Sequence, residues 1–133
     1  MQVKRIHHIN FIVRDLDAAI ERYRILFGDP VDSPEFLPQR GVKLARFRIS
    51  ETWVVLVQPI DPHGEPAKYL EQHGEGFFLM SLETDSLQGE VGRLGEAMFD
   101  GAERSGLDDW QVRDVDVAGM FGARLQLVES GGS

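Results

Sequence analysis

Residues 6–28 read IHHINFIVRDLDAAIERYRILFG and contain two hydrophobic periods, one after the other. In residues 6–13 apolar and polar side chains alternate, which is typical of a strand with one buried face. Asp15 can cap a helix, and Gly28 can end it. Apolar residues recur between these two at helical spacing: Leu16, Ala19, Ile20, Tyr23, Leu26 and Phe27. The chain therefore opens with a strand followed by an amphipathic helix.

The rest of the chain predicts two more runs of strands and two more helices. Extended segments are expected at 42–49 and 52–59, and a further short strand within 29–40 is weakened by Pro34 and Pro38. A helix over 65–73 begins near a proline. The second half predicts a strand at 77–84, a helix marked by Leu87, Val91, Leu94 and Met98, a short strand around 98–103, and strands at 110–117 and 124–129.

The two halves repeat each other with one offset. Leu16 and Leu87 are 71 residues apart, and so are Val54 and Leu125, which lie in the last strand of each half. One offset therefore aligns both the helices and the closing strands, which indicates a duplicated βαβββ unit. We expect one α+β domain over 1–129, with module 1 at about 3–59, a connector at about 60–76, module 2 at about 77–129, and a flexible tail at 130–133.

The predicted strands have one uniformly apolar face and one mixed face. The apolar face is suited to packing under the two helices. The mixed face combines large apolar residues with a few polar ones, as ligand-binding pockets do. Its members include His8, Asn10, Trp53, Val55, Leu79, Ser81, Glu83, Arg124 and Gln126. We therefore expect the two sheets to curve into a cup, an incompletely closed β-barrel with the helices outside.

Composition excludes several classes of function. The 133 residues contain no cysteine, which excludes disulfides, thiolate metal sites and thiol nucleophiles. The net charge of −8 lacks the basic patch that nucleic-acid binding needs. No apolar run is long enough to span a membrane, and no signal peptide is expected. A cytoplasmic protein that binds a small molecule is the resulting expectation.

The residues also resemble a known family. Residues 7–19 (HHINFIVRDLDAA) look like the opening strand and helix of the glyoxalase/bleomycin resistance/dioxygenase (vicinal oxygen chelate) superfamily. Residues 58–60 (QPI), 66–70 (PAKYL) and 74–76 (GEG) are similar to its methylmalonyl-CoA epimerase branch. The resemblance covers nearly the whole chain. It implies the cupped fold and a homodimer, which open strand edges also favour.

The resemblance places four metal ligands of the family at His8, Val55, Leu79 and Gln126. The repeat selects the same positions, because 8 and 79, like 55 and 126, are 71 residues apart. Only His8 is a good ligand, Gln126 is a weak one, and the two apolar residues cannot coordinate an ion. We therefore expect no metal or other cofactor; if a metal binds, His8 and Gln126 would hold it.

Two functions follow from this reading. The first is a metal-independent isomerase, epimerase or lyase acting on a small carbonyl or acyl-thioester compound, with fixed hydrogen-bond donors in place of the metal. The second is a non-catalytic protein that binds or sequesters a small molecule, as bleomycin-resistance proteins do. The enzyme is slightly favoured, and the sequence does not name a substrate.

Several side chains have two interpretations each. His8 is a general base or a locally bonded histidine, Glu83 is a catalytic acid or base or a solvated residue at the strand end, and Arg124 clamps an anion or pairs with Glu83. Asn10, Ser81 and Gln126 would orient a ligand, and Trp53, Val55 and Leu79 would line its pocket.

Other residues were assigned to the surface or the core. His7 is expected on the opposite face, in a structural or solvated position. Trp53 and Trp110 stack on a ligand or pack in a core. Asp108, Asp109, Asp114 and Asp116 suggest turns or solvated edges. Lys43, Arg46 and Arg48 meet a coenzyme A phosphate or form a solvated outer face, and the second is preferred.

Overall fold

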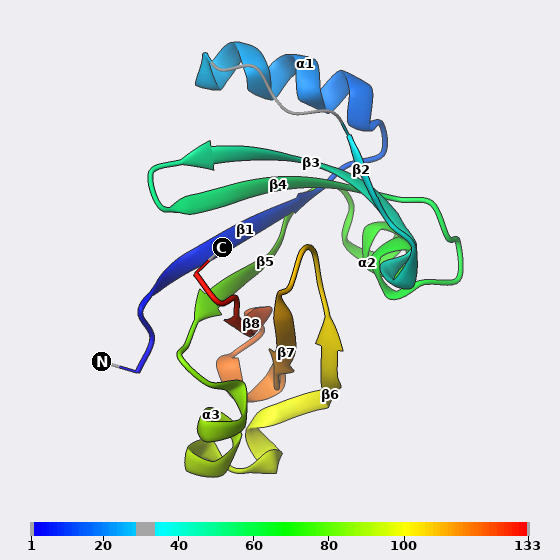
Figure 1. The fold of residues 1–133 in the computed structure, drawn as a ribbon. Coiled ribbons are helices and arrows are strands. Elements are labelled where there is room, and N and C mark those ends of the chain that lie inside the picture. The colour runs from blue at the N-terminus through cyan, green and yellow to red at the C-terminus, as the bar shows by residue number, and fades with distance from the viewer. Residues whose placement is uncertain (1, 29–33, 133) are drawn as a thin grey trace. The chain divides into compact units, whose positions relative to one another are not determined.

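The computed structural model describes residues 2–28 and 34–132 and has the predicted α+β architecture (Figure 1). The order of its elements agrees with two βαβββ modules joined by the helix α2. They are β1 (Arg5–Ile12), α1 (Leu16–Phe27), β2 (Glu35–Leu37), β3 (Val42–Ile49), β4 (Thr52–Pro59), α2 (Glu65–His73), β5 (Gly76–Glu83), α3 (Leu87–Leu94), β6 (Phe99–Ser105), β7 (Gln111–Val115) and β8 (Leu125–Glu129). The short strand expected within 29–40 is β2, and residues 29–33 lie outside the described part.

The chain forms two compact units that do not coincide with the two modules in the sequence. The central unit is Ile9–Phe78, and the terminal unit combines the residues up to His8 with those from Leu79 onward. In the central unit the strands follow the order β2-β3-β4-β1, and in the terminal unit they follow β1-β5-β8-β7-β6. Strands β1 and β5 are therefore each divided between the two units.

Hydrogen bonds confirm the duplication that the sequence predicts. Asp15 caps α1 by accepting from the amide of Ala18 at 3.1 Å, and Ser86, 71 residues later, caps α3 by accepting from Gly89 at 3.0 Å. The first amide of each helix is bound by a side chain from the closing strand. Leu16 donates to Gln58 at 2.7 Å, and the repeat equivalents Leu87 and Glu129 make the same bond at 2.9 Å.

Two details differ from the sequence prediction. Helix α3 ends at Leu94, and Met98 lies in a separate 3₁₀ turn, because Gly95 adopts φ 88° and leaves the helical region. The offset of 71 holds for β1 and β5 and for the closing strands. It does not hold for β3 and β7, which begin at Val42 and Gln111. The connections before and after these strands therefore differ in length between the two modules.

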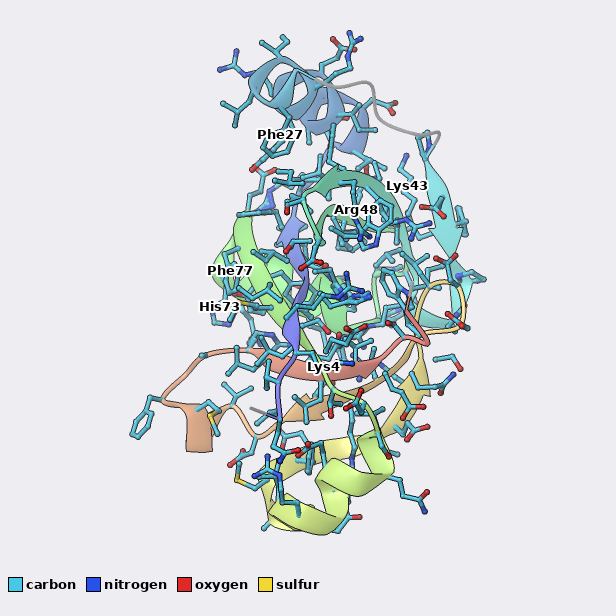
Figure 2. All side chains as sticks on the ribbon, turned by 60° about the vertical axis from the view of Figure 1, so that its left-hand side comes forward. Lys4, Phe27, Lys43, Arg48, His73 and Phe77 are labelled. Atoms are coloured by element: carbon cyan, nitrogen blue, oxygen red, sulfur yellow. The ribbon has the colours of Figure 1, made fainter. Side chains whose placement is uncertain are left out.

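The core of the central unit lies between α1 and the strands below it (Figure 1). The predicted apolar face supplies Val13, Val54 and Leu56, and α1 supplies Leu16, with Ala45 and Phe47 joining from β3. Figure 2 shows Phe27 on the strand-facing side of α1, where its ring meets Phe47 at 5.2 Å. Burying side chains of this size contributes about 1.5–3 kcal/mol each.

The terminal unit repeats this packing with a smaller helix. Leu87 of α3 packs with Phe99, Val115 and Leu127, so one face of β6, β7 and β8 is covered by α3. Leu82 and Leu125, both expected on the helix-covered face, pack against the same cluster. None of the described helices has the length and hydropathy needed to cross a bilayer.

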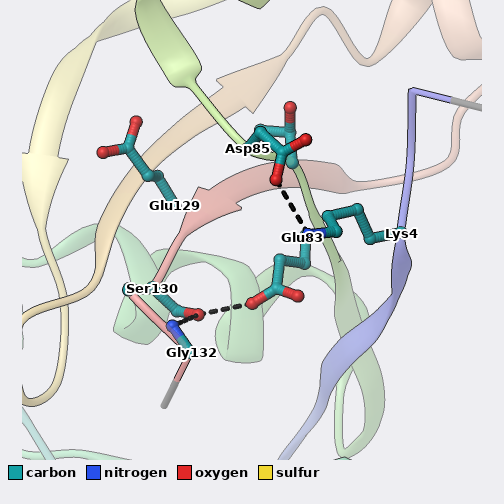
Figure 3. Close-up of a pocket in the computed structure, with 8 residues that line it drawn as sticks. Lys4, Glu83, Asp85, Glu129, Ser130 and Gly132 are labelled. Carbon is teal, nitrogen blue, oxygen red and sulfur yellow. Dashed lines mark hydrogen bonds and ion pairs between the residues drawn. The ribbon is translucent and has the colours of Figure 1, made fainter.

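The C-terminal segment differs from the expected flexible tail at its first residue. Ser130 is only 1% exposed, and its hydroxyl donates to Glu83 at 2.5 Å (Figure 3). Gly132 in turn donates its amide to the same hydroxyl at 3.2 Å. The composition of residues 130–133 hides this contact, because glycine and serine give no sign of a buried polar partner.

Candidate functional site

The side chains predicted for the site are divided between the two units. Those in the terminal unit are His8, Leu79, Ser81, Glu83, Arg124 and Gln126, and those in the central unit are Asn10, Trp53 and Val55.

His8 is a buried imidazole whose orientation is fixed by neighbouring rings. It is 5% exposed, and its ring stacks on Trp110 with centroids 4.9 Å apart and planes 16° from parallel. Of the two positions expected for His7, structural or solvated, the structure shows the first, because His7 is completely buried. Its ring meets Trp110 edge-on at 4.5 Å, so this indole contacts both histidines.

The two histidines are also joined by a hydrogen bond. Their Nδ1 atoms lie 2.9 Å apart. When both rings are neutral, one Nδ1 must donate and the other must accept. If His8 donates, its Nε2 keeps a lone pair and can accept a proton. The contact is compatible with either tautomer of His8, and the two tautomers differ in which ring nitrogen can act as a base.

A row of polar side chains crosses three strands of the terminal unit. Register places Ser81 of β5 opposite Gln126 of β8, and Gln126 opposite Asp114 of β7. Ser81 donates to the Gln126 amide oxygen at 2.9 Å, and the Gln126 amide nitrogen donates to Asp114 at 3.3 Å. Arg104 binds both oxygens of Asp114, at 2.5 and 3.2 Å. Gln126 is thus fixed by protein partners at both ends.

Asp114 corrects an expectation from the sequence. It is neither a turn residue nor a solvated edge, because it lies inside β7 with its side chain one-third exposed. The paired arginine compensates for the partial burial of the carboxylate.

Glu83 forms an ion pair with Arg5, not with Arg124 as considered from the sequence. Arg5 Nε and Nη2 donate to the two carboxylate oxygens at 3.0 and 3.2 Å, and Ser130 adds the third bond. Burial raises the pKa of Glu83, but the bonds from Arg5 and Ser130 and the charges of Arg5 and His7 outweigh it and hold this pKa below its usual value. An ionised carboxylate with three donors is a weak base.

A shallow hollow of about 280 Å³ opens beside Glu83 (Figure 3). It is lined by charged residues that bind one another, including Lys4, which donates to Asp85 at 2.8 Å. Glu129, also on its wall, holds the first amide of α3. These internal bonds leave the hollow with little to offer a ligand.

Leu79 and Arg124 complete the predicted set in the terminal unit. Leu79 is the first residue of β5 that belongs to this unit, and it is 4% exposed. Arg124 comes just before β8 and is half-buried, and its carbonyl accepts from the amide of Met80 at 3.1 Å. This bond fixes the backbone from which the guanidinium extends.

The central unit holds a tryptophan between two arginines. Register places Arg48 opposite Trp53 and Arg46 opposite Val55, so all four side chains leave the same face of the sheet. The preference for a solvated outer face was therefore wrong for Arg46, which is mostly buried, whereas Arg48 is exposed but lies on the face opposite α1. The alternation along β3 puts Lys43 on the other face, with Ala45 and Phe47.

Asn10 lies on β1 in the same unit. Its Oδ1 is buried and accepts no hydrogen bond from any residue within 2–28 or 34–132. A buried acceptor without a donor is destabilising, so this oxygen can receive an N–H or O–H from a ligand or a water molecule.

The residues at the expected metal positions do not fit a divalent transition metal. Val55 and Leu79 are buried hydrocarbons, the oxygen of Gln126 is occupied by Ser81, and Nδ1 of His8 is occupied by His7. Throughout the described residues, no three His, Cys, Asp or Glu side chains group closely enough to hold a metal. Structural and catalytic sites for such ions use at least three protein ligands.

Comparison with known proteins agrees with the architecture. Residues 7–113 match the profile of the Glyoxalase/Bleomycin resistance protein/Dioxygenase superfamily. The chain belongs to this superfamily. The match covers most of the chain and confirms the resemblance seen in its sequence.

Similar proteins within the superfamily include epimerases of acyl-CoA compounds. An ethylmalonyl-CoA/methylmalonyl-CoA epimerase of Cereibacter sphaeroides is 28% identical over 96 residues, which are 71% of this chain and 72% of that protein. A methylmalonyl-CoA epimerase of Mycobacterium tuberculosis has a TM-score of 0.86 at 23% identity, with 96% of this chain and 88% of that chain covered.

A hypothetical protein of Bacillus halodurans has a TM-score of 0.87 at 21% identity, with 95% of this chain and 94% of that chain covered. A Streptomyces coelicolor methylmalonyl-CoA epimerase variant, in complex with 2-nitronate-propionyl-CoA, has a TM-score of 0.85 at 24% identity over 95% and 94%. At these identities the structural likeness establishes the superfamily fold alone.

Sequence reasoning missed two residues around the polar side chains of the terminal unit, Arg5 and Arg104, and did not identify the neighbours of Trp110. Arg104 and Arg5 gave no signal, because an arginine in a strand is usually solvated. Trp110 did give one, since an indole beside a strand start requires a large neighbour. Nothing in the sequence identifies that neighbour as the His7–His8 pair.

Proposed function

We propose that this chain is a metal-independent isomerase or epimerase that moves the acidic α-proton of an acyl-CoA thioester. The chemical class comes from the similar epimerases, and metal independence is supported because residues 2–28 and 34–132 offer no group of three His, Cys, Asp or Glu side chains that could hold a metal. The observation that carries the proposal is the fixed imidazole of His8, bonded at Nδ1 and stacked on Trp110.

In this proposal Nε2 of His8 takes the α-proton. The C–H bond breaks, and its electron pair forms the enolate of the thioester. A water molecule then donates a proton to the opposite face, which gives the epimer, and the protonated His8 gives its proton to the hydroxide left behind. The scheme requires the tautomer in which Nδ1 of His8 donates to His7 across the 2.9 Å contact, because this tautomer leaves Nε2 as the base. Arg124 is assigned the enolate or a substrate anion.

Glu83 receives a different assignment in this scheme. Its bonds to Arg5 and Ser130 already occupy the carboxylate, so we assign it to holding the strand ends and not to proton transfer.

The homodimer expected from the sequence stays a prediction, which sedimentation velocity will check.

The test is exchange of the α-proton in deuterium oxide, followed by proton NMR on methylmalonyl-CoA and ethylmalonyl-CoA. The protein is first dialysed against a chelator. Exchange should persist after dialysis, and His8→Ala should slow it about 100- to 10,000-fold, the usual contribution of a general base. His63→Ala is the matched control, because His63 is an exposed histidine of the connector.

Two results would contradict the proposal. One is exchange in His8→Ala within threefold of the wild-type rate, provided that circular dichroism shows the variant folded. The other is loss of exchange on chelation with recovery on adding zinc or cobalt. If His8→Ala unfolds, His8→Gln replaces it in the test, because glutamine keeps a polar side chain of similar length.

A binding protein is the second candidate, and the polar row favours it. The side chains of Ser81, Gln126 and Asp114 satisfy one another, as structural polar groups do. None of the three therefore needs a catalytic role to explain its presence. If acyl-CoA compounds raise the melting temperature while no α-proton exchanges, this function replaces the enzyme.

A further inference from the structure

Two guanidinium groups approach the same indole in the central unit. Cζ of Arg46 and Cζ of Arg48 each lie 4.7 Å from the centroid of the Trp53 ring. Both distances are within the range of a cation–π contact. The two cations are therefore no more than twice that distance apart, on the sheet face opposite α1.

The two arginines differ in how their charges are compensated. Nε and Nη2 of Arg46 donate to the two oxygens of Glu35, at 2.8 and 3.0 Å, and the arginine is mostly buried. Arg48 is exposed, and its Nε donates to the carbonyl of Ser50 at 3.0 Å. Among the residues that the structure describes, none accepts from the two terminal nitrogens of Arg48.

This geometry prepares Arg48 to bind an anion. The indole contact and the bond to Ser50 fix the plane of its guanidinium, so less conformational freedom is lost on binding. The terminal nitrogens can then meet two oxygens side by side. The positive charge stands out in a chain whose net charge is −8. Figure 2 shows the position of Arg48 on β3.

We propose that Arg48, held against Trp53 and supported by Arg46, binds an oxyanion of an acyl-CoA ligand. The oxyanion is a phosphate of coenzyme A or the carboxylate of a malonyl-type acyl group, since both present paired oxygens to a guanidinium. This inference rests on the acyl-CoA ligand of the proposed function and adds a binding subsite to it. An ordinary solvated arginine would have no such fixed plane.

The test is calorimetric titration of the full chain, which needs no turnover. The ligands are coenzyme A, dephospho-coenzyme A, propionyl-CoA and methylmalonyl-CoA. Arg48→Gln should raise Kd about 10- to 100-fold, the loss expected for a charge-assisted pair of hydrogen bonds. Arg22→Gln is the matched control, because it removes the same charge from an exposed position on α1 and should change Kd less than about twofold.

The pattern over the four ligands identifies the oxyanion. A loss confined to methylmalonyl-CoA assigns Arg48 to the carboxylate. A loss for every ligand except dephospho-coenzyme A assigns it to the 3′-phosphate, and an equal loss for all four assigns it to the diphosphate. Arg48→Lys should recover only part of the affinity, because an ammonium lacks the planar fork.

The inference is overturned if the wild-type chain binds these ligands and Arg48→Gln binds them equally well, or if Arg48→Gln and Arg22→Gln weaken binding by the same factor. Either result leaves the proposed function in place. If the wild-type chain binds none of the four, both the subsite and the acyl-CoA function are wrong.

Discussion

The ion pair between Arg5 and Glu83 allows the assignment of Glu83 to be tested. The two side chains are 17% and 12% exposed, and the carboxylate receives three hydrogen bonds. The substitution Glu83→Gln removes the charge and leaves Arg5 mostly buried without its anion. Removing one member of a buried pair costs about 3–5 kcal/mol. Because the amide oxygen of glutamine keeps one acceptor, we expect a loss of about 2–3 kcal/mol.

The measurement is urea unfolding at pH 7, followed by far-UV circular dichroism. The neighbouring pair of Lys4 and Asp85 provides the control, since these side chains are 52% and 82% exposed. Asp85→Asn should cost less than about 1 kcal/mol, as exposed pairs do. The slope against urea should stay unchanged in both variants, so that the midpoint alone reports the difference.

The difference should also depend on pH, with a sign set by the pKa of Glu83. This pKa is lower in the folded protein than its ordinary value of 4.5. The stabilisation from the charged form is therefore complete above pH 4.5 and is lost as the pH falls through the folded value. The gap between wild type and Glu83→Gln should be full at pH 7 and narrow in acid.

Two results would refute this reasoning. The first is a cost of Glu83→Gln no larger than that of Asp85→Asn, or a gap that does not narrow in acid. The second is a folded Glu83→Gln protein whose α-proton exchange falls 100-fold or more, because that result would return Glu83 to the catalytic role.

Three further predictions concern the fold. Asp15→Ala should cost about 1 kcal/mol in urea unfolding by removing the cap of α1, and Ser86→Ala should cost a similar amount at α3. Gly41→Ala should lower the melting temperature, because Gly41 has φ 68° and a Cβ there would lie 2.5 Å from Cβ of Asp61; Gly28→Ala, at φ 78° with no neighbour within 4 Å, should lower it less. Leu56→Ala should cost about 2–5 kcal/mol, since Leu56 is fully buried, while Leu26→Ala, at a side chain 73% exposed, should cost less than about 0.5 kcal/mol.

The elements of this fold could be predicted because each obeys a local rule. Strands β3 and β4 match their predicted ranges, since apolar alternation and a turn define both. The 71-residue offset predicted the duplication, and the paired bonds to Leu16 and Leu87 confirm it. The offset could not predict that β1 and β5 each divide at mid-strand between two compact units. That division depends on long-range packing, which a repeat in the sequence does not record.

Predictions for the site were weaker because side-chain partners are not local. The sequence was enough to predict which face of β3 carries Arg46 and Arg48, since both alternate with Ala45 and Phe47 along the strand. The partner of Glu83 was not readable, because Arg5 is 78 residues away and an arginine in a strand has no characteristic pattern. His7 and Trp110 are separated by a comparable length of chain, so the burial of His7 also required the structure.

Hydrogen bonds within the fold separate two kinds of polar residue, those with protein partners and those without, which the sequence alone does not distinguish. Ser81, Gln126 and Glu83 all receive or give hydrogen bonds within the protein, so folding alone accounts for their polarity. Oδ1 of Asn10 is different, because it is buried and has no donor among the described residues. The terminal nitrogens of Arg48 have no acceptor there either, although the plane of the guanidinium is fixed. The fold therefore positions one acceptor and one pair of donors without pairing them inside the described protein. Both lie in the central unit, and both are available to bind a ligand.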